Sequence, residues 1–251
     1  MYNIATNTLF IGKPLIYLPT CHSTNDIARE IASSNQGYEG ATVITSEQTA
    51  GKGQRGNKWE AEPGKNLTLS IILKPKSLPI ARQFSLNMSI SLAVYEVLTK
   101  YLGQKVKIKW PNDVLFEDKK LCGILIENSV RGQYIETSIA GIGINVNQEK
   151  FNEPNAVSLK MILGNEIPLE TIAANLFESI EANYLGIVHK EDALKVRYLE
   201  SLYRLHEEHT YKSGDNYFKG RICNVDETGQ LIIKTAEGER SFQFKEVQYI
   251  L

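Results

Sequence analysis

The sequence predicts an α+β protein, in which a mixed, mostly antiparallel sheet and helices are followed by a small C-terminal β-barrel. Helical periodicity is confined to a few stretches that stand apart from a run of alternating, β-branched segments, so the regular strand–helix alternation of α/β proteins is missing. After about residue 206 the chain changes to short β-rich pieces separated by glycine-containing turns, which is typical of small barrels. We therefore expect two domains, residues 1–205 and 206–251.

Composition narrows the function classes. The 251 residues are 42% hydrophobic and 23% charged, with a net charge of −1, which is ordinary for a globular protein and argues against bulk nucleic-acid binding. No apolar stretch approaches the ~18 residues of a membrane span, and MYNIATNTLF lacks the regions of a signal peptide. Cys21, Cys122 and Cys223 form neither a disulfide framework nor a zinc-binding spacing. We expect a cytoplasmic protein with no membrane and no nucleic-acid partner.

The chain begins with a predicted helix and two predicted strands. Residues 23–34 place apolar side chains on one face behind a possible N-cap at Ser23 or Thr24, which predicts a helix. The β-branched stretches ATVITS (41–46) and NLTLSIIL (66–73) predict strands on either side of a glycine-rich loop.

A long helix and an antiparallel run of strands follow. Residues 80–102 repeat apolar side chains at intervals of three and four and predict the helix. KVKIKW (105–110) alternates lysines with apolar residues and predicts a half-buried strand. After the break at PND, VLF and LCGILIE predict a hairpin, and residues 134–147 predict a further strand beyond a turn near Arg131 and Gly132.

The last part of the chain predicts two helices and then short strands. Residues 168–185 are amphipathic, and a second helical stretch covers 191–205. The tail alternates YFKGRICNV, QLIIKT and RSFQFKEVQYI with turns that contain glycine, which predicts the barrel named above.

The glycine loop GKGQRG (51–56) allows several interpretations. It fits G-x-G-x-x-G, but the following residues cannot form the helix that a dinucleotide site needs, and Asn57 stands where a P-loop has lysine. The glycines would let the backbone approach a ligand closely, and three cations without an acid favour an anion. The cations are Lys52, Arg55 and Lys58. The alternative is a basic surface loop.

Asp113 and Lys120 flank the predicted hairpin turn. If the turn takes two residues, Glu117 and Asp118, then Asp113 and Lys120 point to one face together with Leu115 and Cys122; a three-residue turn would reverse this parity. The two charges form either a plain surface ion pair or, beside a phosphate site, a metal-binding aspartate and a lysine that binds phosphate or carboxylate.

Alternate glycines in GIGIN (141–145) remove side chains from one strand face. Either a ligand approaches there, or the glycines mark a place where another part of the chain crosses the sheet.

Together these stretches resemble biotin protein ligases, in the form that lacks an N-terminal DNA-binding domain. The likeness covers nearly the whole chain and rests on ordered motifs: STN (23–25), EQTAGKGQRGNKW (47–59), NLTLS (66–70), KWPNDV (109–114), KLCGILIE (120–127) and GIGINVN (141–147). It implies the biotin–lipoate ligase fold, which is similar to class II aminoacyl-tRNA synthetases, with a C-terminal barrel.

The resemblance implies roles for individual residues. Lys120 would bind the reacting carboxylate and the α-phosphate, and Asp113 would orient or deprotonate the acceptor and could hold Mg²⁺. The residues implied to bind biotin are Ser23, Thr24, Asn25, Gln48, Gly51, Lys52, Gly53, Gln54, Lys120 and Gly123. The residues implied to bind the nucleotide or its phosphates are Lys52, Arg55, Gly56, Asn57, Trp59, Lys109, Asn112 and Asn145.

The implied reaction consumes ATP, with Mg²⁺, in two steps. Biotin's carboxylate attacks the α-phosphorus to give biotinyl-5′-AMP and pyrophosphate, and a lysine of a biotin carboxyl carrier protein then displaces AMP. Negative charge gathers on phosphate oxygens, so cations and backbone N–H groups are needed. The resemblance is compatible with a monomer or a homodimer. Because STN begins at residue 23, we expect no N-terminal helix-turn-helix and no DNA binding.

The chain differs from the biotin protein ligases at two positions of the glycine loop, and three alternative functions stand beside the one implied. Biotin protein ligases often carry arginine where this chain has Lys52 and Gln54; lysine keeps the charge but loses the bidentate geometry, and glutamine loses the charge. The rivals are a lipoate or octanoate ligase, a non-catalytic biotin-binding sensor, and a scaffold whose tail binds peptides. The presence of Lys120 and Asp113 argues against the sensor, and the scaffold leaves the first 150 residues unexplained.

Overall fold

The computed structural model describes residues 4–34 and 37–250. Its strands are β1 (Leu15–Cys21), β2 (Thr42–Gln48), β3 (Leu67–Leu73), β4 (Val106–Lys109), β5 (Asp113–Phe116), β6 (Lys119–Arg131), β7 (Tyr134–Ile144), β8 (Glu208–Ser213), β9 (Asn216–Val225), β10 (Leu231–Thr235), β11 (Gly238–Phe242) and β12 (Gln248–Tyr249). Its helices are α1 (Thr24–Ala32), α2 (Phe84–Leu102), α3 (Leu159–Leu163), α4 (Leu169–His189) and α5 (Glu191–Glu200), with short 3-10 turns η1 (Gln54–Gly56), η2 (Ile80–Arg82) and η3 (Gly103–Lys105).

The seven-stranded sheet carries all the candidate motifs. Its strand order is β1-β2-β3-β7-β6-β5-β4. Within the described residues β1 and β2 are its one parallel pair, and the other neighbours are antiparallel. The α+β prediction with a mixed, mostly antiparallel sheet is therefore confirmed.

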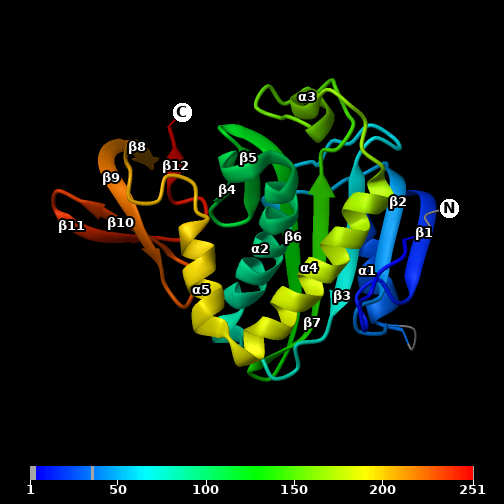
Figure 1. Cartoon of the computed structure of the whole chain (residues 1–251). Helices are drawn as coiled ribbons and strands as arrows, with labels where there is room; N and C mark the ends of the chain where they lie inside the picture. The colour runs from blue at the N-terminus through cyan, green and yellow to red at the C-terminus, as the bar shows by residue number, and fades with distance from the viewer. Residues whose placement is uncertain (1–3, 35–36, 251) are drawn as a thin grey trace.

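The two faces of this sheet differ in chemistry. The odd-numbered residues of β3 (Leu67–Leu73) belong to the main hydrophobic core, together with residues of α2 and α4, which lie across this face in Figure 1. Ile72 belongs instead to a smaller cluster with Ala28 of α1. Because strand side chains alternate, Thr68 and Ser70 share the face of Ile72, and both are buried. Polar side chains therefore gather on the α1 face.

Strand β1 was not predicted from the sequence. Its stretch LIYLPTC contains Pro19, and a proline argues against a central strand because it cannot donate a backbone hydrogen bond. Among the described strands β1 pairs only with β2, so it lies at the edge of the sheet, where a proline is tolerated.

The hairpin prediction is confirmed for Asp113 and Lys120 and wrong for Cys122. The turn is the two-residue one, Glu117 and Asp118, and Lys120 pairs with Leu115. The register shifts between Val114 and Leu115, so Cys122 lies opposite Val114. Cys122 therefore points into the main core and not toward Asp113. The irregularity breaks the strict alternation on which the prediction depended.

The predicted helices are confirmed with different ends. The helix expected for 80–102 begins only at Phe84, after η2, and the helix expected for 191–205 ends at Glu200. Beyond that residue the backbone pairs with β4: Ile108 N–H donates to the Ser201 carbonyl (2.9 Å), and Tyr203 N–H donates to the Ile108 carbonyl (2.8 Å). Tertiary pairing overrides the helical pattern there.

The tail forms a five-stranded antiparallel sheet in the order β11-β10-β9-β8-β12, shown at the left in Figure 1. Its turn at Gly229 contacts the large sheet, because the Trp110 indole N–H donates to the Gly229 carbonyl at 2.9 Å. The tail strands are thus confirmed, whereas closure into a barrel and the domain boundary after residue 205 stay predictions. None of the helices among the described residues is long and apolar enough to cross a membrane.

Candidate active site

The start of α1 holds a buried polar cluster. Ser23, Thr24 and Asn25 are only 1%, 3% and 3% exposed. Ser23 occupies the N-cap position, but its side chain makes no capping bond. Gln48, at the end of β2, takes that role: its Oε1 accepts from Thr24 N–H (2.8 Å) and from Thr24 Oγ1 (3.1 Å). The prediction of a cap by Ser23 or Thr24 has the right place and the wrong chemical group.

Asn25 extends this cluster across the sheet. Its Oδ1 lies 2.6 Å from Ser70 Oγ, and its Nδ2 donates to the Glu127 carboxylate at 2.7 Å. A Cβ at Gly141 would stand 2.2 Å from Asn25 Oδ1. The absence of a side chain at Gly141 is therefore what allows the Asn25 amide to lie against β7.

The glycine loop is a small closed hairpin. Gly53 N–H donates to the Asn57 carbonyl (2.7 Å), and Trp59 N–H donates to the Gly51 carbonyl (3.0 Å). Gly56 has φ of +86°, a conformation that glycine adopts without strain. The Arg55 side chain lies outside the described part of the structure. The Gly53 amide of the predicted anion nest thus bonds within the loop.

Lys52 ties this loop to α1. Its ammonium lies 2.6 Å from the Asp26 carboxylate, which also accepts from Arg29 at 2.9 Å. Burial alone would raise the pKa of Asp26, but the hydrogen bonds and charges of Lys52 and then Arg29 outweigh burial and hold that pKa below its ordinary value. Asp26 therefore stays ionised at neutral pH and keeps the loop tied to the helix.

Trp59 explains the glycines of β6 and β7. A Cβ at Gly143 would stand 2.4 Å from the indole ring, and a Cβ at Gly123 would stand 2.8 Å from it. The ring lies on these two glycines, which pair with each other across the strands. Its Nε1 is buried and has no hydrogen-bond partner among the described residues, and the same is true of Gln54 Oε1 in the same loop. Of the two interpretations of GIGIN, the structure contains the crossing segment. This segment is the end of the glycine loop, because Trp59 lies across Gly143 of β7.

Asp113 and Lys120 form an ion pair at the edge of this glycine surface. The Lys120 ammonium lies 2.8 Å from Asp113 Oδ1 and 5.7 Å from the centre of the Trp59 ring. The side chains are 35% and 30% exposed, so a substrate can reach both. Asp113 lies opposite Gly123 in the register, which places the charges next to the Trp59 surface.

The two predicted asparagines are buried and engaged with backbone. Asn112 Nδ2 donates to the Ile124 carbonyl, which fixes the KWPND turn to β6. Asn145 Nδ2 donates to the Val157 carbonyl at 3.2 Å, whereas its Oδ1 is buried and meets no donor in the part of the chain that the structure describes. A buried unsatisfied acceptor costs about 1–3 kcal/mol, so a ligand donor at Asn145 Oδ1 would be stabilising.

Lys109 joins the site from the tail side. It lies opposite Asp113 in the β4–β5 register, and its ammonium lies 5.1 Å from the centre of the Tyr249 ring. Burial lowers the pKa of Lys109, which Asp113 raises and Lys120 and Arg204 lower further. The tail sheet therefore contributes one wall beside Asp113.

The structure thus brings the predicted residues into two neighbouring sets that the glycine loop joins. The first set lies at the start of α1 with Gln48, and the second contains Asp113, Lys120, Trp59 and Asn145. Sequence reasoning missed Ser70 and Glu127, which bond to the first set. It also missed Asp26 and Arg29, which connect Glu127 to Lys52. The polar alternation of NLTLS was the available signal for Ser70, and nothing in the sequence pairs Glu127 with Asn25.

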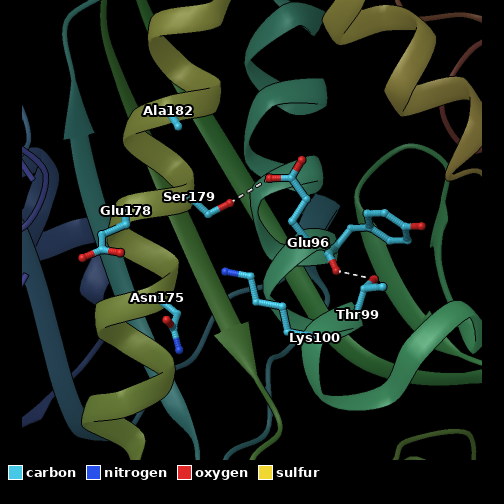
Figure 2. Close-up of a pocket in the computed structure, with 8 residues that line it drawn as sticks. Glu96, Thr99, Lys100, Asn175, Glu178, Ser179 and Ala182 are labelled. Carbon is cyan, nitrogen blue, oxygen red and sulfur yellow. Dashed lines mark hydrogen bonds between the residues drawn. The ribbon is translucent and has the colours of Figure 1, made fainter. Parts of the chain in front are cut away.

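A groove of about 540 Å³ between α2 and α4 contains none of the predicted residues. Figure 2 shows Glu96, Lys100, Glu178 and Ser179 around it, with Ser179 bonded to Glu96. This groove lies on the face of the sheet that α2 and α4 cover, whereas the two sets lie on the face that α1 covers. We therefore place the candidate active site on the α1 face.

Gly143 offers a direct test of this placement. A Gly143→Ala change puts a methyl group into the Trp59 ring, and the backbone cannot retreat because β3 and β6 hold it on both sides. We expect at least a tenfold loss of ligand binding and activity with the fold retained, because overpacking costs about 1–3 kcal/mol. Gly186→Ala is the matched control, since its added Cβ meets nothing within 4 Å. Equal effects of both changes on ligand binding would contradict the placement.

Comparison with known proteins fits this geometry. The Biotin/lipoate A/B protein ligase family matches residues 17–145. A biotin--[acetyl-CoA-carboxylase] ligase of Paracoccus denitrificans is 29% identical over 90% of this chain and 96% of its own. The bifunctional ligase/repressor BirA of Bacillus subtilis is 28% identical over 96% of this chain and 75% of its own. The biotin protein ligase of Aquifex aeolicus in complex with biotin and ATP superposes with a TM-score of 0.79 at 28% identity, covering 95% of this chain and 100% of that one. The chain belongs to the biotin/lipoate A/B protein ligase family.

Proposed function

We propose that this protein is an ATP-dependent biotin protein ligase, which activates biotin as biotinyl-5′-AMP and transfers it to a lysine of a carrier protein. The observation that carries the proposal is the Asp113–Lys120 pair (2.8 Å) beside the glycine surface under Trp59. The chain matches most of the length of the biotin ligases named above. A buried polar cluster that could bind the urea ring of biotin lies on the same face of the sheet as the pair.

In the first step the chain must stabilise charge on the α-phosphate. As the biotin carboxylate attacks, negative charge spreads over the phosphate oxygens and the departing pyrophosphate. Lys120 is the ammonium of the second set and can bind both the attacking carboxylate and an α-phosphate oxygen. Lys109 adds a second cation across the β4–β5 pair. Asn145 Oδ1 and Trp59 Nε1 have no partner within the described residues. Asn145 Oδ1 can accept a hydrogen bond from the nucleotide, and Trp59 Nε1 can donate one to it.

In the second step the acceptor amine must lose a proton. A lysine amine in water has a pKa of about 10.4, so it is mostly protonated at pH 7. Asp113 is the carboxylate closest to Lys120 and can orient the incoming ammonium and accept its proton. The glycine loop, tied through Lys52 to α1, is suited to keep water away from the mixed anhydride.

For the proposed Mg²⁺ site the protein offers one carboxylate, that of Asp113. Among the described residues no group of three His, Cys, Asp or Glu side chains converges on one point. Mg²⁺ commonly binds one or two carboxylates together with substrate phosphates, which fits Asp113 beside ATP. When bound there it would neutralise phosphate charge.

The remaining proposals concern partners and organisation. The acceptor is proposed to be a biotin carboxyl carrier domain, because the relatives are named for acetyl-CoA carboxylase. The chain is proposed to work as a catalytic part, 1–205, and a tail part, 206–251, as a monomer or homodimer in the cytoplasm, without a nucleic-acid partner.

Exchange of labelled pyrophosphate into ATP tests the activity directly. We expect exchange with biotin and none with lipoate or octanoate at equal concentration. Exchange with lipoate alone would replace biotin by lipoate as the substrate within the same family. Biotin binding without exchange would favour a sensor, and neither binding nor exchange with any of these acids would overturn the proposal.

A further inference from the structure

Glu127 lies at the centre of the polar cluster at the start of α1, although it belongs to a strand of the sheet and not to the helix. It lies on β6, on the same face as Gly123, and its carboxylate bonds to two residues one turn apart on α1. Asn25 Nδ2 donates to one oxygen at 2.7 Å, and Arg29 donates to the other at 2.6 Å. Charge-assisted bonds of this length are about twice as strong as neutral ones.

The carboxylate determines which way the Asn25 amide points. An ionised carboxylate can only accept hydrogen bonds, so the amide nitrogen of Asn25 must face Glu127 and its oxygen must face Ser70, 2.6 Å away. Turning the amide would place two oxygens against each other. Gly141 leaves room for the amide group, because a Cβ there would stand 2.2 Å from Oδ1.

This direction passes on to the hydroxyl groups of Ser70 and Thr24. The Ser70 hydroxyl must donate its one proton to Asn25 Oδ1, so the Thr24 hydroxyl, 2.7 Å away, is left to donate to Ser70 Oγ. Next to Thr24, the Thr24 backbone N–H fixes Gln48 by donating to its Oε1 at 2.8 Å, so Gln48 Nε2, which has no partner among the described residues, is free to donate to a ligand. A urea ring needs such a donor for its carbonyl and acceptors for its two N–H groups.

A second chain of bonds leads from Glu127 through Arg29 to the glycine loop, and the two chains together form one network. Arg29 also bonds to Asp26 at 2.9 Å, and Asp26 pairs with Lys52 at 2.6 Å. Gln48 and Lys52, the two ends of the network, stand four residues apart in the chain. The carboxylate of Glu127 connects the two arms.

We propose that Glu127 is a positioning residue for recognition of the ureido ring of biotin: it orients the Asn25 amide and, through this amide, the hydroxyl groups of Ser70 and Thr24, without touching the substrate. This rests on the proposed assignment of the start of α1 to biotin. The inference assigns Glu127 to substrate affinity and separates it from the chemistry at Lys120.

Steady-state exchange kinetics of Glu127→Ala and Glu127→Gln test the assignment. For Glu127→Ala we expect the KM for biotin to rise about 10- to 100-fold, the effect of losing a bond to a charged group, with kcat and the KM for ATP within about threefold of the parent. Glu127→Gln should recover most of the affinity, because its Oε1 can still accept from Asn25. This recovery is the result that a merely structural role would not give, and it remains measurable if the alanine variant does not fold.

Two further variants make the outcome decisive. Glu136→Ala is the matched control: Glu136 pairs with an arginine, Arg131, on the neighbouring strand and lies away from the cluster, so its KM for biotin should not change. Thr24→Val tests the proposed site itself and should raise the KM for biotin. If Thr24→Val raises it and Glu127→Ala does not, the role of Glu127 is wrong and the site stands. If neither raises it, the site assignment is wrong as well.

Discussion

Lys120→Met should reduce biotin-dependent pyrophosphate exchange by about 10²- to 10³-fold, the loss typical of removing one group that stabilises transition-state charge. The methionine keeps the length of the side chain and its contact with the Trp59 ring, whose centre lies 5.7 Å from the ammonium. The charge alone is removed, so the proposed phosphate site loses the ammonium group that we assign to it. Biotin binding, measured by calorimetry without ATP, should fall by less than exchange does.

Lys119→Met is the matched control, because Lys119 precedes Lys120 on the same strand but pairs with Phe116 and is exposed. Exchange by this variant should stay within about twofold of the parent. A loss in Lys119→Met equal to that in Lys120→Met would mean that general positive potential, and not a placed ammonium, supports the reaction.

The sequence predicted the large sheet well because its strands repeat with a clear period. KVKIKW alternates cleanly, and β4 has Val106 and Ile108 buried with lysines between them. The misses come from contacts between distant segments. β1 contains a proline that an edge position tolerates, and residues after Glu200 pair with β4 instead of extending α5. Neither position in the fold can be read from a local pattern.

The candidate site shows the same division. Local patterns singled out the glycine loop, Asp113, Lys120 and GIGIN, and all of them lie on one face of the sheet. The pattern did not reveal what the glycines accommodate, because Trp59 and Asn25 reach Gly143 and Gly141 from far along the chain. One register irregularity in β6 sent Cys122 into the core, where burial raises the pKa of its thiol. Single-residue register shifts depend on tertiary packing that periodicity does not encode.

Asp113→Asn should separate the two half-reactions. Asparagine keeps the size of the side chain, can still accept from Lys120, which lies 2.8 Å from the carboxylate, and keeps one carbonyl oxygen of the kind that Mg²⁺ binds, so exchange should fall by less than about tenfold. Transfer of biotin from preformed adenylate to a carrier domain should fall by about 10²- to 10³-fold, because general-base assistance contributes about that much. Single-turnover transfer and exchange, measured on the same preparation, give the two numbers.

The pH dependence of this variant distinguishes a proton acceptor from a group that only orients Lys120. A free lysine amine becomes neutral as pH approaches about 10, so the transfer defect of Asp113→Asn should shrink as pH rises if Asp113 accepts the proton. Asp118→Asn is the control, since Asp118 lies in the turn of the same hairpin and accepts from Tyr203. A defect that is equal in both half-reactions and constant with pH would assign Asp113 to holding Lys120 in place. In that case the ion pair would act as one unit in adenylate formation, and the acceptor lysine would have to lose its proton to solvent or to a phosphate oxygen.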